Sequence, residues 1–460
     1  MTVSVHDCSG CTGYGSWSED GDGEPNLRRF RELGAPLRHR DYRLLWLAQV
    51  ASELGDWSGR LALAVLVQQR TGSTTLTALV TTVSVLPYIG LGQWLATLAD
   101  RYPRRPIIVA TDLARAALFA SMVIPQPVWS LFALALAAAV LTPLFEAARN
   151  SLTIHTVPRA EYGDAIALAN LTFELGLLVG YAVGGGLASA FGPKTALLIN
   201  ACSFIASALL LRRMSVGSTS AAADGEPTRV RDGWRVVTGD PFVRRFLLTY
   251  GVIGASAIVG EALVVPYAVD ELGGGPGQAG LLAAAIPCGA ILATILTRSR
   301  GTDTEKLRRA SVVALAGALV AILFFAAGPP SPVVMVAFAA IGAMLASRVP
   351  ANEVAGLRIP DRVRGSAFTI IQGFLLGGQA VAAAIGGVLA RWIGIRETLV
   401  FFLAIAALVS AWGSSMPPTE GRHAARVRRR GEAGGPTPGG STRPMASEAG
   451  GRSPQLPPDD

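Results

Sequence analysis

The sequence is poor in charge. Charged residues make up 16% of the 460 residues, whereas soluble globular chains have about 25%. Hydrophobic residues make up 51%, and the mean hydropathy is +0.43. The net charge of +8 would indicate nucleic-acid binding only if the basic residues gathered on one soluble face. They stand between apolar segments instead, so we expect a lipid bilayer as partner and no nucleic acid.

Cysteine clusters and nucleotide-binding loops are also missing. Cys202 and Cys288 stand inside apolar runs, which is typical of small buried hydrophobic residues. Cys8 and Cys11 have C-x-x-C spacing, but no second pair or histidine cluster completes a zinc site. The alternative to metal binding is that this spacing arises by chance in a polar, glycine-rich segment. No G-x-x-x-x-G-K-S/T loop occurs, and residues 1–43 lack the apolar core of a cleavable signal peptide. We therefore expect no ATP-driven pump, no metal, no cofactor and no enzyme.

Long apolar runs dominate the chain. A helix that spans a bilayer needs about 20 apolar residues, and runs of this kind occupy 44–67, 76–98, 107–124, 128–149, 165–190, 194–211, 246–269, 279–297, 307–327, 332–351, 366–389 and 397–413. The sequence thus predicts an all-α integral membrane protein with twelve transmembrane helices. Six form an N-terminal half (44–211) and six a C-terminal half (246–413), joined by a cytoplasmic linker (212–245). The polar tails 1–43 and 414–460 are predicted to be disordered.

The basic residues predict the orientation. On these spans only four of the forty Lys and Arg residues fall in outward loops, namely Arg70, Lys194, Arg391 and Arg396. Every alternate loop is basic, as the positive-inside rule requires. We expect a plasma-membrane protein with both termini in the cytoplasm, because one miscounted helix would invert half of this pattern.

The two halves also resemble each other. Gly163, Gly184-Gly185 and Gly192 recur 202 positions later as Gly365, Gly386-Gly387 and Gly394. A constant offset across a span and its flanking loops is better evidence for a repeat than any single match. An even number of spans in each repeat gives both copies the same orientation.

The charged turn between the second and third runs carries a family resemblance. Leu98-Ala99-Asp100-Arg101 and Arg104-Arg105 resemble the pattern G-x-L-A-D-R-x-G-R-R/K of the major facilitator superfamily. Ala96 and Pro103 stand where the pattern has glycine. The resemblance implies the twelve-helix fold of that superfamily, with two six-helix halves.

A second motif lies in the fifth run. Gly176, Gly180, Gly184 and Gly185 resemble the antiporter motif G-x-x-x-G-P-x-x-G-G, with Tyr181 in place of proline, and the motif implies export. Small residues at this spacing also pack helices closely. Further stretches resemble the bacterial efflux branch that includes macrolide and enterobactin exporters: 41–46, 55–57, 71–73, 112–116 and 145–149.

Ionisable residues inside the spans are candidates for proton coupling or substrate binding, because each costs about 2.5–3.5 kcal/mol at mid-helix. Glu53, Asp56 and Arg60 share one helical face. A carboxylate beside a guanidinium can exchange a proton as substrate enters and leaves, or the residues can form a permanent ion pair. Glu174 and Glu261 are lone acids, each either a protonation site or a neutral hydrogen-bonding group.

The charged turn is a candidate cytoplasmic gate. We predict that Asp100, Arg101, Arg104 and Arg105 hold the inside closed, with Asp112, Arg115, Glu146 and Arg149 as partners. The alternative is that these charges only set orientation, but Asp contributes little to that, so we favour the gate. The second copy keeps Arg298 and has Thr297 opposite Asp100.

These features predict a monomeric secondary transporter that exports a small amphipathic or hydrophobic compound, in the class of drugs, antibiotics or siderophores, by proton antiport. Its partners are the small-molecule substrate, protons and lipid. An importer of a nutrient or siderophore would share the architecture. A scaffold or receptor without transport is the third hypothesis.

Overall fold

The structure, a computed structural model, describes residues 34–88, 103–215, 230–297, 302–328, 331–349, 359 and 361–415. Every element in these ranges is helical. Eight of the described helices are long and apolar enough to cross a membrane, and two shorter ones, Thr74–Tyr88 and Pro332–Leu345, are also apolar. The chain is therefore a multi-pass membrane protein.

The helices up to residue 215 are η1 (Ala35–Arg38), α2 (Arg40–Thr71), α3 (Thr74–Val85), η2 (Leu86–Tyr88), α5 (Arg104–Ser121), α6 (Val128–Thr156), η3 (Arg159–Glu161), α7 (Tyr162–Phe191) and α8 (Pro193–Arg212). The later helices are α9 (Val230–Gly239), α10 (Pro241–Pro266), η4 (Tyr267–Glu271), α11 (Pro276–Thr297), α12 (Asp303–Ala327), α13 (Ser331–Leu345), α15 (Asp361–Ile393) and α16 (Ile395–Ser414). The described part of each predicted apolar run is mainly helical, and residues 89–98, 350 and 351 of these runs lie outside the described residues.

Local sequence explains where several helices begin and end. Gly72 adopts φ +57° at the end of α2, and the Ser73 hydroxyl then accepts the Leu76 amide to start α3. Thr302 and Glu305 form a capping box that starts α12. Single glycines with positive φ, Gly192 (84°) and Gly394 (101°), separate α7 from α8 and α15 from α16. These two turns are 202 residues apart.

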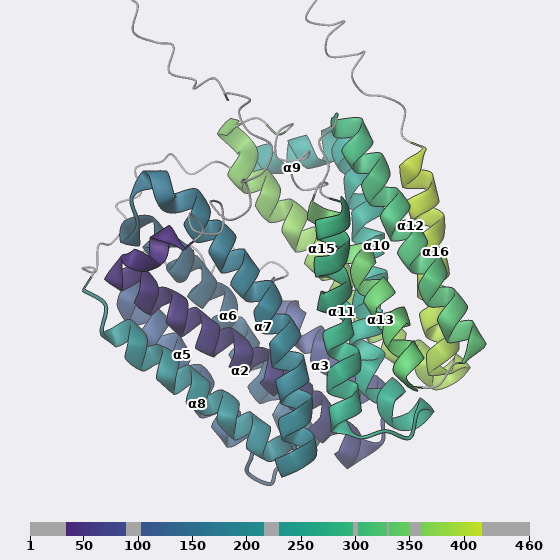
Figure 1. Cartoon of the computed structure of the whole chain (residues 1–460), viewed down its shortest axis with the longest axis horizontal. Helices are drawn as coiled ribbons and strands as arrows, with labels where there is room; N and C mark the ends of the chain where they lie inside the picture. The colour runs from purple at the N-terminus through teal and green to yellow at the C-terminus, as the bar shows by residue number, and fades with distance from the viewer. Residues whose placement is uncertain are drawn as a thin grey trace, which may run out of the picture. The chain divides into compact units, whose positions relative to one another are not determined.

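Glycine pairs bring α7 and α15 against two neighbours each. A Cβ built on Gly184 would lie 2.6 Å from Ser58 Cα of α2, and one on Gly185 would lie 2.6 Å from Gly280 Cα of α11. Figure 1 shows α7 beside α11 accordingly. On α15, Gly386 meets Val259 of α10 and Gly387 meets Ala78 of α3 in the same way. The predicted glycine repeat therefore corresponds to a repeated set of helix contacts.

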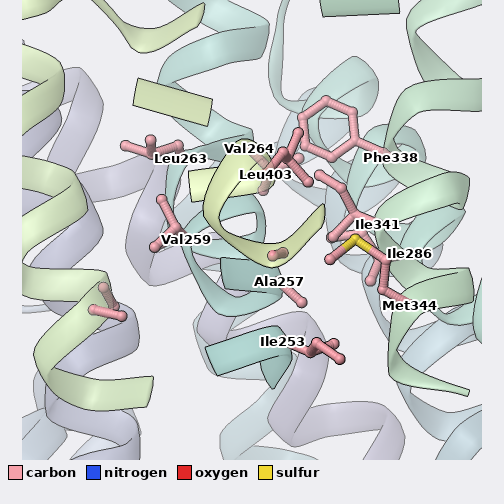
Figure 2. Packing of buried hydrophobic residues seen from close by; sticks show 14 of the residues in the cluster. Ile253, Ala257, Val259, Leu263, Val264, Ile286, Phe338, Ile341, Met344 and Leu403 are labelled. Atoms are coloured by element: carbon pink, nitrogen blue, oxygen red, sulfur yellow. The ribbon is translucent and has the colours of Figure 1, made fainter. Parts of the chain in front are cut away.

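The largest apolar cluster lies among α10, α11, α13 and α16. Ile253, Val264, Ile286, Phe338 and Leu403 are at most 3% exposed and interdigitate with Ile341 and Met344 (Figure 2). Such packing fixes these helices relative to one another, because interiors at crystal-like density leave few voids.

The region 212–245 differs from the sequence prediction of a polar linker. A ten-residue helix, α9, lies within it, and α10 already begins at Pro241, where Asp240 caps the first turn by accepting the Phe242 amide. Three charged residues and two glycines interrupt the ten residues of α9, so no apolar run marked the helix. The 1–33 part of the N-terminal tail, with Cys8 and Cys11, lies outside the described residues, as does 416–460.

Candidate functional site

A cavity of about 1090 Å³ lies between α2, α3, α6 and α7 on one side and α10, α11 and α15 on the other. Its lining covers the middle of α2 (residues 52–64), α7 (169–181) and α15 (372–379). On α3, α6 and α11 it continues toward the end of the bundle at which α2, α7 and α15 start; we call this the near end. At that end Arg149 of α6 and Arg348, just after α13, belong to the wall. A cavity of this size matches the volumes of small-molecule sites.

The opposite, or far, end is closed by contacts between the same two groups of helices. The Gln68 amide donates to both carboxylate oxygens of Asp270 at 3.1 and 3.0 Å, and its own oxygen accepts from Thr77 at 2.7 Å. The Thr75 hydroxyl donates to the Gly387 carbonyl at 2.8 Å. Together with the Gly185–Gly280 contact, these bonds leave the cavity no wide exit at the far end.

The charged face of α2 forms part of the cavity wall. Arg60 pairs with Asp56 at 2.9 Å, and its guanidinium lies 4.5 Å from the centre of the Trp57 ring. Glu53 faces Arg149 of α6 at 3.6 Å and accepts the Trp57 indole N–H at 3.2 Å. The i, i+4 spacing placed Asp56 beside Arg60, whereas the Glu53–Arg149 pair depends on how α2 meets α6.

The two lone acids of the sequence also reach the cavity. Glu261 accepts a hydrogen bond from the Tyr181 hydroxyl of α7 at 2.5 Å. Glu174 makes no hydrogen bond or ion pair within the described residues, and Arg348 lies in the same cavity wall. All five predicted coupling or cavity residues, Glu53, Asp56, Arg60, Glu174 and Glu261, thus line one space.

The predicted gate is only partly described. Asp100 and Arg101 lie outside the described residues. Arg104 is buried and donates to His155 Nε2 of α6 at 2.7 Å. Arg105 donates to the last carbonyls of α8, those of Leu211 (3.2 Å) and Arg212.

In this structure neither arginine pairs with Asp112, Arg115, Glu146 or Arg149, and the gate contacts of the state closed on the inside stay a prediction. The start of α5 lies beside the ends of α6 and α8, where free helix carbonyls and His155 are nearer. The four predicted partners bond elsewhere.

Asp112 and Arg115 form a buried pair inside the α5–α8 contact. Their side chains meet at 2.5 Å with 0% and 3% exposure, and the Ser207 hydroxyl of α8 donates to Asp112 at 2.6 Å. The Arg115 guanidinium lies between the rings of Phe145 and Phe204, 4.5 and 4.3 Å from their centres. Arg115 also reaches the cavity.

Aromatic donors to the cavity carboxylates were not predicted. Trp57 bonds Glu53, Tyr88 bonds Glu146 at 3.1 Å, and Tyr181 bonds Glu261. The only signal in the sequence was Tyr181 itself, which replaces a motif proline. The other two pairings depend on tertiary contacts.

The motif glycines pack α7 along α2. A Cβ on Gly176 or Gly180 would lie 2.9 Å from Glu53 Cβ or 2.7 Å from Trp57 Cβ. The close helix packing expected for small residues is thus what Gly176, Gly180 and Gly184 do in the structure. It holds α7 directly against the charged face of α2.

The comparisons with known proteins agree with this architecture. The chain is 26% identical over 376 residues to the uncharacterised MFS-type transporter YfiS of Bacillus subtilis (strain 168), covering 79% of this chain and 90% of the relative. It is 25% identical over 401 residues to the multidrug efflux pump Tap of Mycobacterium tuberculosis (strain ATCC 25618 / H37Rv), covering 80% and 91%. An inward-facing crystal structure of a bacterial homologue of the human lysosomal transporter Spinster superposes with a TM-score of 0.63 at 16% identity, covering 82% and 97%.

The fold and these relatives define a transporter of the major facilitator superfamily, as the motifs predicted. Residues 33–428 match the family described as transmembrane secretion effectors, and the chain belongs to that family. The predicted resemblance to an efflux branch of the superfamily is confirmed.

Proposed function

We propose that the chain exports a small amphipathic or hydrophobic compound in exchange for protons, through alternating access to the cavity. The observation that carries the proposal is the cavity itself, which gathers the carboxylates of Glu53, Asp56, Glu174 and Glu261 and is closed at the far end. Carboxylates inside a membrane bundle are costly and mark ion or substrate pathways.

The layout that we propose has twelve spans in two six-helix halves, α2 to α8 and α10 to α16, with α9 in the linker. Helices α2 and α5 are not among the eight apolar helices because they carry charged residues. The charged residues in the middle of these two helices face the cavity or pair with each other. Residues 89–102, which follow α3 and η2, and residues 329–330 and 350–358 on either side of α13 lie outside the described residues, so these two spans are described in part. The matching contacts of Gly184-Gly185 and Gly386-Gly387 support two equivalent halves.

The loop charges place both termini and the near end in the cytoplasm. The structure then represents a state whose cavity opens inward. In this state Arg104 and Arg105 are bound to α6 and α8 of their own half. We propose that the turn with Asp100 and Arg101 engages the other half only when the inside closes, as a monomeric rocking transporter requires.

Coupling follows from competition for the same carboxylates. Asp56 and Glu53 each lie beside an arginine, Arg60 and Arg149, and a substrate that displaces these arginines would favour protonation of the carboxylate left behind. The apolar part of the wall, with Phe145, Phe173 and Ile258 among others, suits a partly apolar cargo. The relative Tap is a multidrug efflux pump, which favours export of drug-like compounds.

Transport in proteoliposomes under an imposed pH gradient tests the proposal. A panel of fluorescent amphipathic dyes serves as cargo, and vesicles of known orientation give the direction. We expect an inward proton gradient to drive the dye outward, away from the cytoplasmic side. Asp56→Asn and Glu53→Gln should each lower gradient-driven transport at least tenfold while leaving downhill dye exchange measurable.

Asp164→Asn is the matched control, because Asp164 lies in the first turn of α7 and does not line the cavity. It should behave as the unaltered protein does. Transport that ignores the gradient, with Asp56→Asn and Glu53→Gln fully active, contradicts proton coupling. Movement toward the cytoplasm only would identify an importer.

A further inference from the structure

Tyr181 occupies an unusual place in the cavity wall. It lies on α7 where the antiporter motif has proline, is 5% exposed, and donates its hydroxyl to Glu261 of α10 at 2.5 Å. The Trp57 ring of α2 contacts the Tyr181 ring edge-on, with centroids 5.5 Å apart and planes at 73°. A proline here would leave Glu261 without this donor.

The Tyr181–Glu261 bond connects the two groups of helices across the cavity. The other bonds between them, Gln68–Asp270 and Thr75–Gly387, lie at the far end and outside the cavity lining. Among the cavity residues that the structure describes, no other hydrogen bond or ion pair makes this connection. Within the cavity, the described connection between α7 and α10 therefore depends on one phenol and one carboxyl group.

We propose that Tyr181 is a positioning residue that makes the side-chain contact between α7 and α10 depend on whether Glu261 carries a proton. A hydroxyl bound to a carboxylate makes a charge-assisted bond about twice as strong as a neutral one. When Glu261 takes up a proton, the bond becomes neutral and the two helices are held together less firmly. The role in coupling rests on the proposed function; the Tyr181–Glu261 dependence itself does not.

The signal from Glu261 has a physical route to the other cavity carboxylates. Trp57 touches Tyr181 with its ring and donates its indole N–H to Glu53. A shift of Tyr181 after protonation of Glu261 would therefore move the donor of Glu53 as well. This contact links acids that stand on α10 and α2.

Few other ionisable groups face Glu261. Tyr181 of α7 and Arg60 of α2 are its neighbours of this kind, and Arg60 already pairs with Asp56. Of the other helices packed against α10, α3, α11, α13 and α15 contribute only uncharged side chains to the cavity wall, and α16 contributes none. Arg348 follows α13 and lies in the same wall. A pH response that depends on Glu261 is therefore expected to pass through Tyr181 or Arg60.

The test compares the thermal unfolding midpoint of the purified full-length protein between pH 4 and 9 for the unaltered chain, Y181F, E261Q and the double variant. When the midpoint is plotted against pH, the change in midpoint that is present in the unaltered chain and absent in E261Q is called the Glu261 step. A hydrogen bond to a charged group contributes about 1.5–3 kcal/mol, equivalent to one or two pH units. Since Tyr181 stabilises the charged form, Y181F should move this step to higher pH by about one unit. The double variant should show no step.

Y42F is the matched control. The Tyr42 hydroxyl is also buried, but it donates to the Ala165 carbonyl at 2.8 Å and does not reach the cavity. Y42F should lower the midpoint at every pH and leave the Glu261 step in place. Any of three results would overturn the proposal. Either Y181F leaves the Glu261 step unmoved, or Y181F still causes a shift when Glu261 is absent, or E261Q removes no step at all.

The same variants separate this proposal from the proposed function. If transport ignores the proton gradient but Y181F still moves the Glu261 step, proton antiport is wrong and the Tyr181–Glu261 dependence stands. If transport follows the gradient and the step does not move, antiport stands and Tyr181 has no part in it.

Discussion

The helix pairs α5–α8 and α12–α16 pack to a similar extent, but the buried contact is charged in the first pair and uncharged in the second. In α5–α8 the buried centre holds Asp112, Arg115 and Ser207. In α12–α16 the buried polar groups are the hydroxyls of Ser311, Thr398 and Ser410, and the buried apolar residues are alanine, leucine, Phe325 and Ile395. The same contrast extends to the cavity, where α2 to α8 contribute the charged residues Glu53, Asp56, Arg60, Arg115, Glu146, Arg149 and Glu174, and the later helices contribute Glu261 and Arg348.

This contrast separates what the fold needs from what the site needs. Among the described residues no fully buried ion pair lies between α12 and α16, so helix packing of this kind does not require one. Buried ion pairs are weak evidence for stability. The charges of α2 to α8 are thus better explained by function, and the sequence already showed the asymmetry in the charged turn, where Thr297 stands opposite Asp100.

The largest effect is expected inside α5–α8. Arg115→Leu leaves Asp112 fully buried without its cation, so the free energy of unfolding should fall by about 3–5 kcal/mol. Ser410→Ala in α16 removes a hydroxyl that has no hydrogen-bond partner among the described residues and should change it by less than about 0.5 kcal/mol. Equilibrium unfolding in mixed micelles measures both.

The double variant Asp112→Leu/Arg115→Leu is the control for this prediction, because replacing a whole buried pair by apolar residues is often neutral. It should recover most of the stability. Equal losses in the single and double variants would show that packing, and not the unpaired carboxylate, is responsible.

The glycine contacts at the far end should respond alike in both halves. Gly185→Ala places a methyl group 2.6 Å from the Gly280 backbone, and Gly387→Ala places one 2.6 Å from Ala78 Cβ. Overpacking of this kind costs about 1–3 kcal/mol, and we expect the larger loss at Gly185, where backbone has to move. Thermal unfolding measures the loss of stability in each variant, and transport measures the loss of function. Gly186→Ala, with nothing within 4 Å, should be tolerated; a cost at Gly186 as large as that at Gly185 would refute the contact.

The smallest effect is expected at the polar contact of the far end. Gln68→Ala removes the amide that joins Asp270 to Thr77. One hydrogen bond contributes about 1 kcal/mol, so the far end should open about fivefold more often. The labelling rate of Leu272→Cys, in a chain otherwise free of cysteine, reports this opening.

Gln126→Ala is the comparison for Gln68→Ala, because the Gln126 amide donates to Ser121 within its own turn. It should leave the labelling rate unchanged. Identical rates in the two variants would show that Gln68 does not hold the far end closed.

Much of the fold was predictable from the sequence because apolar run length and glycine positions have local causes. The turns at Gly192 and Gly394 lie where the repeat predicted them. Helix α9 was missed because ten residues with Arg231 and Arg235 among them make no apolar run. Its position depends on contacts with α10 and α15, which local sequence does not encode.

Of the candidate site, the sequence predicted residues and not their partners. Asp56 and Arg60 stand four apart on one helix, so their pairing follows from helix geometry. Glu53–Arg149, Tyr88–Glu146 and Arg104–His155 join residues 51 to 96 positions apart. Such pairs depend on the relative rotation of helices, which many packed side chains determine together.

Helix α7 has a mechanical consequence. It runs without a break for 30 residues, about 45 Å at 1.5 Å per residue, because tyrosine stands where proline would bend it. Three of its glycines pack directly against α2, so we expect the two helices to move as one rigid body. The Gly280 contact lies toward one end of this body, and Glu174 lies nearer the other end. Because these two helices move as one body, a displacement on the cavity side also shifts the Gly185–Gly280 contact.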